Sequence, residues 1–246
     1  MWGDIMAWFF TEPFVGDYYT ITGENAKHIE KSLRMKKGEK ITLVDSCGIQ
    51  HNGIIDNIMP NSVTVKVCES FKCENEPSVT VTLYQALPKG DKMDLIVQKA
   101  VELGVTEIVP IISARCISRP DQRSLNKKAE RWQKIALQAA QQSRRGIIPQ
   151  VKRALSLKQA VANLQGDSCN IIFYECGGEK VGSIIKPNIG HINMFIGSEG
   201  GFELQEVESV VEKGGKPATL GKRVLRAETA PLAALSVIMY ETGNLG

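Results

Sequence analysis

Hydrophobic and polar positions follow two different patterns along the chain, and the pattern changes near residue 74. In the first part, alternating or β-branched runs at 41–44, 53–55 and 62–67 predict short strands joined by tight turns. Only residues 24–35 show the apolar spacing of a helix in this part. Short strands with tight turns are typical of a small barrel or sandwich, so we expect an N-terminal β domain.

A polar stretch at 72–77 separates this part from a second one, in which strands alternate with helices. Apolar runs predict strands at 79–84, 107–112, 170–174, 192–196 and 217–220. Spacings of three and four predict helices at 92–103, 125–142, 155–164, 203–212 and 230–241. For the last helix we expect Thr229 as the N-cap and Pro231 in the first turn. The alternation predicts an α/β domain with a mainly parallel sheet covered on both faces, and we place the two domains at 1–74 and 75–246.

Composition changes this picture little, because 43% hydrophobic and 23% charged residues are typical of a globular protein. No apolar run is long enough to span a bilayer, and residues 1–10 lack the basic start of a signal peptide. The six cysteines form no CxxC pair and there are only three histidines, which argues against a zinc site. Scattered thiols fit a reducing compartment, so we expect a cytoplasmic protein without a metal.

The charge is distributed unevenly. Residues 113–153 contain eleven Lys or Arg against two acids, a local charge of +9 in a chain whose net charge is +3. A solvated helix face would explain the residues at 125–134 alone. The whole block favours a polyanion such as RNA, because Lys and Arg displace counterions from phosphates.

The stretch FIGSEGG at 195–201 leads from a predicted strand into a predicted helix. It lacks the Lys and Ser or Thr that end a Walker loop, and its glycines do not match the dinucleotide-binding spacing. Glu199 would repel a pyrophosphate, which favours a neutral or cationic ligand. Taken alone, the stretch is more typical of a structural turn.

Two other segments that contain Gly and Glu also follow predicted strands. They are FYECGG at 173–178 and LGKRVLRAETAP at 220–231. Ligands of open α/β sheets bind outside the carboxyl ends of the strands. We therefore predict that these three strand ends build one pocket for a small ligand, recognised largely by backbone groups.

The motif IGSEGGF at 196–202, followed by LGKRVLRAETA at 220–230, closely resembles the signature of the SPOUT, or trefoil-knot, RNA methyltransferases. Within them the chain is similar to the bacterial 16S ribosomal RNA (uracil-N3)-methyltransferase family. The stretches KHIEKSLRMKKGE at 27–39, LPKGDKMDLIVQKAVELGVTEIVPI at 87–111 and RWQKIALQAAQQSRR at 131–145 also match the pattern of that family. The resemblance covers almost the whole chain.

The resemblance implies an N-terminal PUA-like β-barrel that helps to hold RNA, and a C-terminal SPOUT α/β domain with a deep trefoil knot. It also implies S-adenosyl-L-methionine as the methyl donor and a homodimer with the pocket near the partner subunit. The cofactor-binding positions that it implies are Tyr174, Glu175, Ile196, Gly197, Ser198, Glu199, Gly200, Gly201, Leu220, Gly221, Leu225 and Arg226. The apolar members of this set also suit simple core packing.

Methylation at N3 of uracil requires loss of the imide proton, which spreads negative charge onto the two flanking carbonyl oxygens. A fixed guanidinium would stabilise that charge. Arg145, at the end of a predicted helix, is the first candidate, although its position also suits a surface Arg at a helix C-terminus. Arg226 is the second candidate, and it could instead order its loop or bind the cofactor carboxylate. Glu228 could cap or form a salt bridge, with a general base as the less favoured alternative.

The resemblance implies 16S ribosomal RNA or the small ribosomal subunit as the partner, with RNA contacts from His28, Arg34, Lys89, Arg115 and Arg145. Two alternatives stay open at this point. One is a SPOUT enzyme that methylates another RNA site, such as a ribose 2′-hydroxyl or a different base. The other is a non-catalytic RNA-binding assembly protein.

Overall fold

The computed structural model describes residues 7–164 and 166–246. Part of the N-terminal segment considered above, residues 1–6, lies outside the described residues. The chain forms two compact units, one of Met1–Glu76 with Ala140–Ile147 and the other of Pro77–Ala139 with Ile148–Gly246. Each unit is described by itself.

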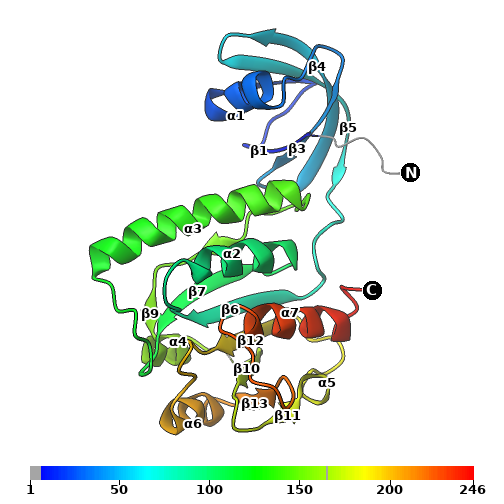
Figure 1. Ribbon diagram of the computed structural model, residues 1–246. Coiled ribbons are helices and arrows are strands. Elements are labelled where there is room, and N and C mark those ends of the chain that lie inside the picture. The colour runs from blue at the N-terminus through cyan, green and yellow to red at the C-terminus, as the bar shows by residue number, and fades with distance from the viewer. Residues whose placement is uncertain (1–6, 165) are drawn as a thin grey trace. The chain divides into compact units, whose positions relative to one another are not determined.

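The first unit is built on a five-stranded sheet that curls around a short helical segment (Figure 1). The strand order is β1-β3-β4-β5-β2, and all pairs are antiparallel except β1 with β3. The strands are β1 (Ala7–Thr11), β2 (Tyr18–Thr22), β3 (Lys40–Asp45), β4 (Ile49–Met59) and β5 (Ser62–Lys72). The three predicted strand runs lie within β3, β4 and β5, whereas the pattern did not single out β1 and β2.

The predicted helix at 24–35 is shorter and less regular than expected. It consists of one α-helical segment, α1 (Gly23–Lys27), followed by a π-helical turn, η1 (His28–Ser32). Ala26 and Ile29 are buried against Ile41, Leu43 and Val65 of the sheet. Burial of these apolar side chains supplies the main stabilisation of the unit.

The second unit contains an eight-stranded sheet in which every pairing is parallel. The strand order is β11-β13-β10-β12-β6-β7-β8, and β9 also pairs with β7. The strands are β6 (Thr80–Ala86), β7 (Glu107–Ile112), β8 (Gln150–Val151), β9 (Leu155–Ser156), β10 (Cys169–Phe173), β11 (Glu179–Lys180), β12 (His191–Ile196) and β13 (Lys216–Thr219). The central strands β6 and β12 are buried along nearly their whole length, as expected for a parallel sheet covered on both faces.

Among the helices of this unit, α7 contacts both α2 and α5, and α4 contacts α6. Their bounds are α2 (Lys92–Glu102), α3 (Gln122–Gln142), α4 (Leu157–Ala162), α5 (Val181–Ile184), α6 (Leu204–Glu212) and α7 (Ala230–Glu241). Both α2 and α7 cover the sheet with buried aliphatic side chains. The predicted parallel α/β architecture is therefore confirmed.

Some local predictions for the second unit were wrong. The expected helix at 155–164 begins with strand β9 and is helical only over Leu157–Ala162. Thr229 stands at the N-cap of α7 but already has helical dihedral angles, and its side chain makes no capping hydrogen bond. Pro231 does lie in the first turn. Among the described residues, no helix is both long and apolar enough to cross a membrane.

Candidate cofactor cavity

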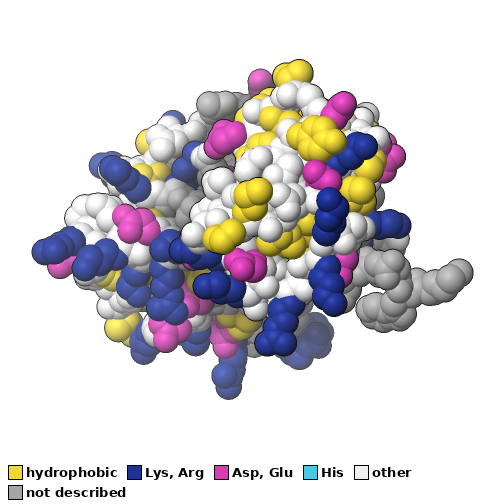
Figure 2. Space-filling model, turned by 90° about the horizontal axis from the view of Figure 1, so that it is seen from above, with side chains coloured by type: hydrophobic (Ala, Val, Ile, Leu, Met, Phe, Trp, Pro, Cys, Tyr) yellow, Lys and Arg dark blue, Asp and Glu magenta, His cyan; other side chains and the backbone are white. Residues whose placement is uncertain are grey.

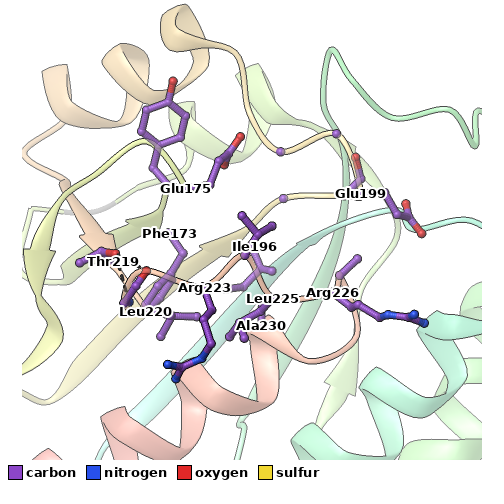
Figure 3. Close-up of a pocket in the computed structure, with 18 of the residues that line it drawn as sticks. Phe173, Glu175, Ile196, Glu199, Thr219, Leu220, Arg223, Leu225, Arg226 and Ala230 are labelled. Atoms are coloured by element: carbon purple, nitrogen blue, oxygen red, sulfur yellow. Dashed lines mark hydrogen bonds between the residues drawn. The ribbon is translucent and has the colours of Figure 1, made fainter.

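Strands β13, β10 and β12 lie side by side and run in the same direction, so their carboxyl ends meet at one edge of the sheet. A cavity of about 460 Å³ lies at this edge, between the loops that follow the three strands (Figure 3). It is lined by Lys92, Phe173, Tyr174, Glu175, Ile196, Gly197, Ser198, Glu199, Gly200, Gly201, Thr219, Leu220, Gly221, Lys222, Arg223, Val224, Leu225, Arg226, Ala227 and Ala230.

Every position that the family resemblance implied for the cofactor lines this single cavity. Gly200, Gly221 and Glu175 come from three different loops and are brought together here. The topology explains why. Adjacent parallel strands deliver their following loops to the same edge, which is where open α/β sheets bind ligands.

The glycine loop at 197–201 folds tightly back on itself. The Gly201 amide donates to the Ser198 carbonyl at 3.0 Å, and these two residues form an isolated antiparallel bridge. Gly201 has a φ of +65°, which glycine adopts without strain. A Cβ built on Gly197 would lie 2.9 Å from the Gly201 Cα, so the loop has no room for a side chain at this position.

Neighbouring side chains hold this loop from outside. The Arg115 guanidinium donates to the Gly200 carbonyl at 3.1 Å, and Gln85 Nε2 donates to the Gly197 carbonyl at 3.3 Å. The Ser198 hydroxyl donates to the Arg115 carbonyl at 3.4 Å. Through these two contacts Arg115, which the resemblance implied for RNA, also supports the loop. Its side chain is exposed.

Lys92, the first residue of α2, joins two walls of the cavity. Its Nζ lies 2.7 Å from Glu199 Oε1 in the glycine loop and 3.2 Å from Glu228 Oε2, which precedes α7. The backbone amide of Lys89 also donates to both carboxylate oxygens of Glu199. The sequence analysis missed Lys92, although the motif at 87–111 contains it. The expected salt bridge of Glu228 is present.

These contacts keep all three groups charged. The hydrogen bond to Glu199 raises the pKa of Lys92 above its ordinary value, and Glu228 adds to the effect. Burial opposes ionisation of Glu199, but the bonds from Lys92 and from backbone amides outweigh it and lower the Glu199 pKa. The pKa of Glu228 is also lowered, mainly by its own backbone amide and then by Lys92. Glu228 is therefore a stable anion rather than a group poised to exchange a proton near neutral pH.

The loop after β13 gives the cavity a basic side. Lys222, Arg223 and Arg226 line it and are exposed, and Figure 3 shows Arg223 and Arg226 extending in different directions from this loop. Neither the hydrogen bonds nor the ion pairs of the described residues engage the Arg226 guanidinium. The cavity is thus less acidic than the glycine loop alone indicated.

Arg145 is placed differently from the sequence expectation. It lies beyond the end of α3, in the first unit, and is only 3% exposed. Its guanidinium pairs with Glu76 at 3.1 Å and 2.5 Å, and the same carboxylate accepts the amides of Gly146 and Ile147. Trp8 Nε1 donates to the Arg145 carbonyl at 3.0 Å. This is a buried structural ion pair, and the predicted contact of Arg145 with the uridine stays a prediction.

The remaining positions implied for RNA are on the surface. His28 and Arg34 are exposed in the first unit, and Arg34 has a φ of +53°. Lys89 is exposed beside the cofactor cavity. Across residues 7–164 and 166–246, no three His, Cys, Asp or Glu side chains come together as a metal site.

Comparisons with known proteins match most of the chain. A family model described as an RNA methyltransferase domain matches residues 74–239, and one described as an RNA methyltransferase PUA domain matches residues 21–68. The ribosomal RNA small subunit methyltransferase E of Bacillus subtilis is 35% identical over 233 residues, which are 91% of this chain and 90% of that protein.

Solved structures of similar chains point to the same family as the sequence comparisons. The ribosomal RNA small subunit methyltransferase E of Neisseria gonorrhoeae, bound to S-adenosyl methionine, superposes with a TM-score of 0.87 at 33% identity and covers 96% of this chain and 97% of its own. A Legionella pneumophila methyltransferase with bound cofactor gives a TM-score of 0.86 at 28% identity, over 96% and 97% of the two chains. With both units matched in order, the chain belongs to the SPOUT RNA methyltransferases, in the family of the small-subunit ribosomal RNA methyltransferases E.

Proposed function

We propose that this chain transfers a methyl group from S-adenosyl-L-methionine to N3 of a uridine in the 16S RNA of the small ribosomal subunit. One observation carries the proposal. Loops from three neighbouring strands, two of which carry the family motifs at 196–202 and 220–230, converge on a single cavity. The relatives named above are ribosomal RNA small subunit methyltransferases, which supports the same substrate here.

The cavity fits this cofactor in size and chemistry. Its volume of about 460 Å³ lies within the range of small-molecule sites, roughly 300–1,000 Å³. Ile196, Leu220 and Leu225 supply apolar contacts for a flat ring, and the backbone groups between them can read the edge of that ring. Glu175 suits a cationic ligand, whereas the charge of Glu199 is already paired with Lys92. When bound, S-adenosylmethionine supplies an activated methyl group.

The task of the protein is to align the uracil and to favour loss of its N3 proton. In-line transfer depends on alignment, which a rigid cavity provides. The uracil anion carries its charge on two carbonyl oxygens, and a nearby guanidinium lowers the energy of that anion. Arg226 lines the cavity and forms no close salt bridge among the described residues, although its charge helps to lower the pKa of Glu228. These features favour Arg226 over the buried Arg145 for this role.

Helix α3 provides a basic surface for the RNA. Asp94 of α2 accepts hydrogen bonds from both Arg131 and the indole of Trp132, which fixes the orientation of the helix. Arg123, Lys127 and Lys134 are then exposed. In the space-filling view, Lys and Arg side chains stand out from much of the surface shown, with acidic groups between them (Figure 2). Exposed cations such as those of α3 suit backbone phosphates rather than bases.

We also propose a homodimer. Helix α7 is apolar almost all round, yet Val237 is 36% exposed and Tyr240 is 68% exposed. Leu95, on the contacting helix α2, is 42% exposed. Such a surface is typical of a subunit interface.

We also propose a cytoplasmic location, which a ribosomal RNA substrate supports.

Nucleoside mass analysis of small-subunit RNA tests the function. RNA from a strain that lacks the gene should contain no N3-methyluridine at the target, and the purified chain with S-adenosylmethionine should restore it in vitro. A methyl group on a ribose or on another base would show a different SPOUT specificity. No methyl transfer to RNA or to assembled subunits, despite bound cofactor, would indicate a non-catalytic protein.

A further inference from the structure

A second cavity, of about 560 Å³, lies in the second unit and shares no lining residue with the first. It covers the amino-terminal halves of β6, β7 and β12, at the opposite end of the strands from the cofactor cavity. Its lining residues are Thr82, Tyr84, Glu107, Val109, Lys152, Arg153, Leu155, Asn163, Ser168, His191 and Asn193. Residues two apart on each strand face it together, as the alternation of side chains requires.

The floor of this cavity is unusually polar for a parallel sheet, whose faces normally carry aliphatic side chains. Tyr84 is only 8% exposed, and its ring stacks on Phe195 with centroids 4.4 Å apart. Its hydroxyl has no hydrogen-bond partner within the described part of the chain. Burial, together with the charge of Glu107, raises the Tyr84 pKa, so the hydroxyl keeps its proton and remains a donor.

Asn193 supplies an acceptor beside this donor. It is 3% exposed, and its Nδ2 donates to Asn170 Oδ1 at 2.8 Å and to Ser168 Oγ at 3.0 Å. Those two bonds fix the amide, and no donor in residues 7–164 or 166–246 reaches its Oδ1. Neither Tyr84 Oη nor Asn193 Oδ1 is among the fully buried unpaired atoms of the described residues, so both are accessible from the cavity. A donor and an acceptor that face one cavity therefore point to a ligand with a complementary edge.

The rim adds a positive charge and apolar walls. Lys152 pairs with Glu107 at 3.0 Å and with Gln150 at 2.6 Å, so its charge is largely compensated. Arg153 is exposed and has no ion-pair partner among the described residues. Val109 and Leu155 flank the polar floor. The cavity thus combines polar floor groups, a Glu107 carboxylate paired with Lys152, apolar sides and the guanidinium of Arg153.

We propose that this cavity binds a single nucleotide, with the base edge against Tyr84 and Asn193 and the phosphate at Arg153. A pyrimidine edge presents an acceptor next to a donor, which matches the two floor groups. The guanidinium suits a phosphate. This nucleotide is distinct from the methylated uridine, because the cavity lies at the end of the strands away from the methyl donor. It is either a free nucleotide or, resting on the proposed function, an unpaired nucleotide of the RNA.

The test uses the full chain saturated with S-adenosylmethionine, so that the first cavity is occupied. Uridine 5′-monophosphate is titrated and followed by calorimetry or ligand-observed NMR, and a short unpaired RNA oligonucleotide is titrated in parallel. We expect saturable binding. Tyr84→Phe keeps the stacked ring and should weaken binding about fivefold, equivalent to one hydrogen bond. Arg153→Ala should weaken it at least as much.

Lys158→Ala is the matched control, because it removes an equal charge from an exposed position of α4 outside the cavity and should leave binding unchanged. If Tyr84→Phe weakens binding of the mononucleotide, the ligand is a free nucleotide. If it weakens binding of the oligonucleotide alone, the ligand is RNA. If Tyr84→Phe and Arg153→Ala bind both probes like the unsubstituted protein, with unchanged melting temperatures, the proposal is overturned. If the unsubstituted protein binds the nucleotide in this cavity but transfers no methyl group to RNA, the result would argue against the proposed function and not against this cavity.

Discussion

Two glycines at the ends of β12 show how much one methyl group can matter. Gly197 follows the strand and Gly190 precedes it, and neither has a positive φ. A Cβ on Gly197 would press on the backbone of Gly201, whereas a Cβ on Gly190 would meet nothing within 4 Å. Gly197→Ala should therefore open the loop and weaken S-adenosylmethionine binding by about tenfold or more, from overpacking of roughly 1–3 kcal/mol.

Gly190→Ala should stay within about twofold of the unsubstituted protein, because the added methyl group has free space. Calorimetric titration of both variants measures the difference directly. Equal affinities in the two variants would mean that the tight loop does not shape the cavity.

Arg145 gives a second prediction at this scale. Removing one partner of a buried ion pair leaves the other charge without compensation, which typically costs about 3–5 kcal/mol. Glu76 is partly exposed and keeps two backbone amides, so we expect Arg145→Ala to lower the free energy of unfolding by about 2–3 kcal/mol. Urea unfolding monitored by circular dichroism measures it. A fully stable Arg145→Ala variant that cannot methylate RNA would return this residue to the catalytic role expected from the sequence.

Among the helices and strands, α7 was predicted best, because the sequence marks both its start and its extent. Residues 230–241 form α7 as expected, because Pro231 and a continuous apolar run mark its start and extent. The two-residue strands β8 and β11 could not be predicted, since their pairing partners in β7 and β13 define them. Apolar spacing likewise does not distinguish the π-helical turn at 28–32, in which Ile29 is buried, from a regular helix.

The candidate site was predicted because its loops follow strands that pair side by side. Lys92 was missed, because its two partners lie more than a hundred residues away along the chain. The ion pair of Glu76 with Arg145 was also not predicted, because only the fold brings the two residues together. The trefoil knot was expected from the family resemblance alone, since hydrophobic periodicity does not determine how a chain is threaded.

Lys92 links α2 to two loops, and its effect should not depend on pH near neutrality. Lys92→Met should weaken cofactor binding by about fivefold, because Glu199 and Glu228 would then repel each other and release the loops. The raised pKa of Lys92 and the lowered pKa values of both carboxyl groups keep the three charges fixed from about pH 6 to 9. The contribution of the carboxylates is lost only as the pH falls through their lowered pKa values.

The measurement is the ratio of the cofactor dissociation constants of Lys92→Met and the unsubstituted protein at pH 6, 7.5 and 9. We expect a constant ratio. A ratio that changes several-fold across this interval would show that one of the three groups titrates within it.

At the scale of the whole molecule, the basic block is expected to act through phosphates. Replacing Arg123, Lys127 and Lys134 by Ala should weaken RNA binding and reduce the slope of log affinity against log salt by about 2, roughly 0.7 for each lost phosphate contact to a single strand. Lys180, Lys186 and Lys213 are exposed elsewhere in the second unit, and their combined replacement is the matched control. Filter binding across a salt series provides the slopes. Equal slopes for the two triple variants would contradict a specific role for α3.

The central claim is that one cavity, built from the loops after β10, β12 and β13, binds S-adenosylmethionine. Calorimetric titration of the full chain with this cofactor, repeated in the presence of excess ATP, tests the claim most directly. We predict saturable binding of one molecule per chain that ATP does not displace. No heat of binding with S-adenosylmethionine, or its complete displacement by ATP, would contradict the account.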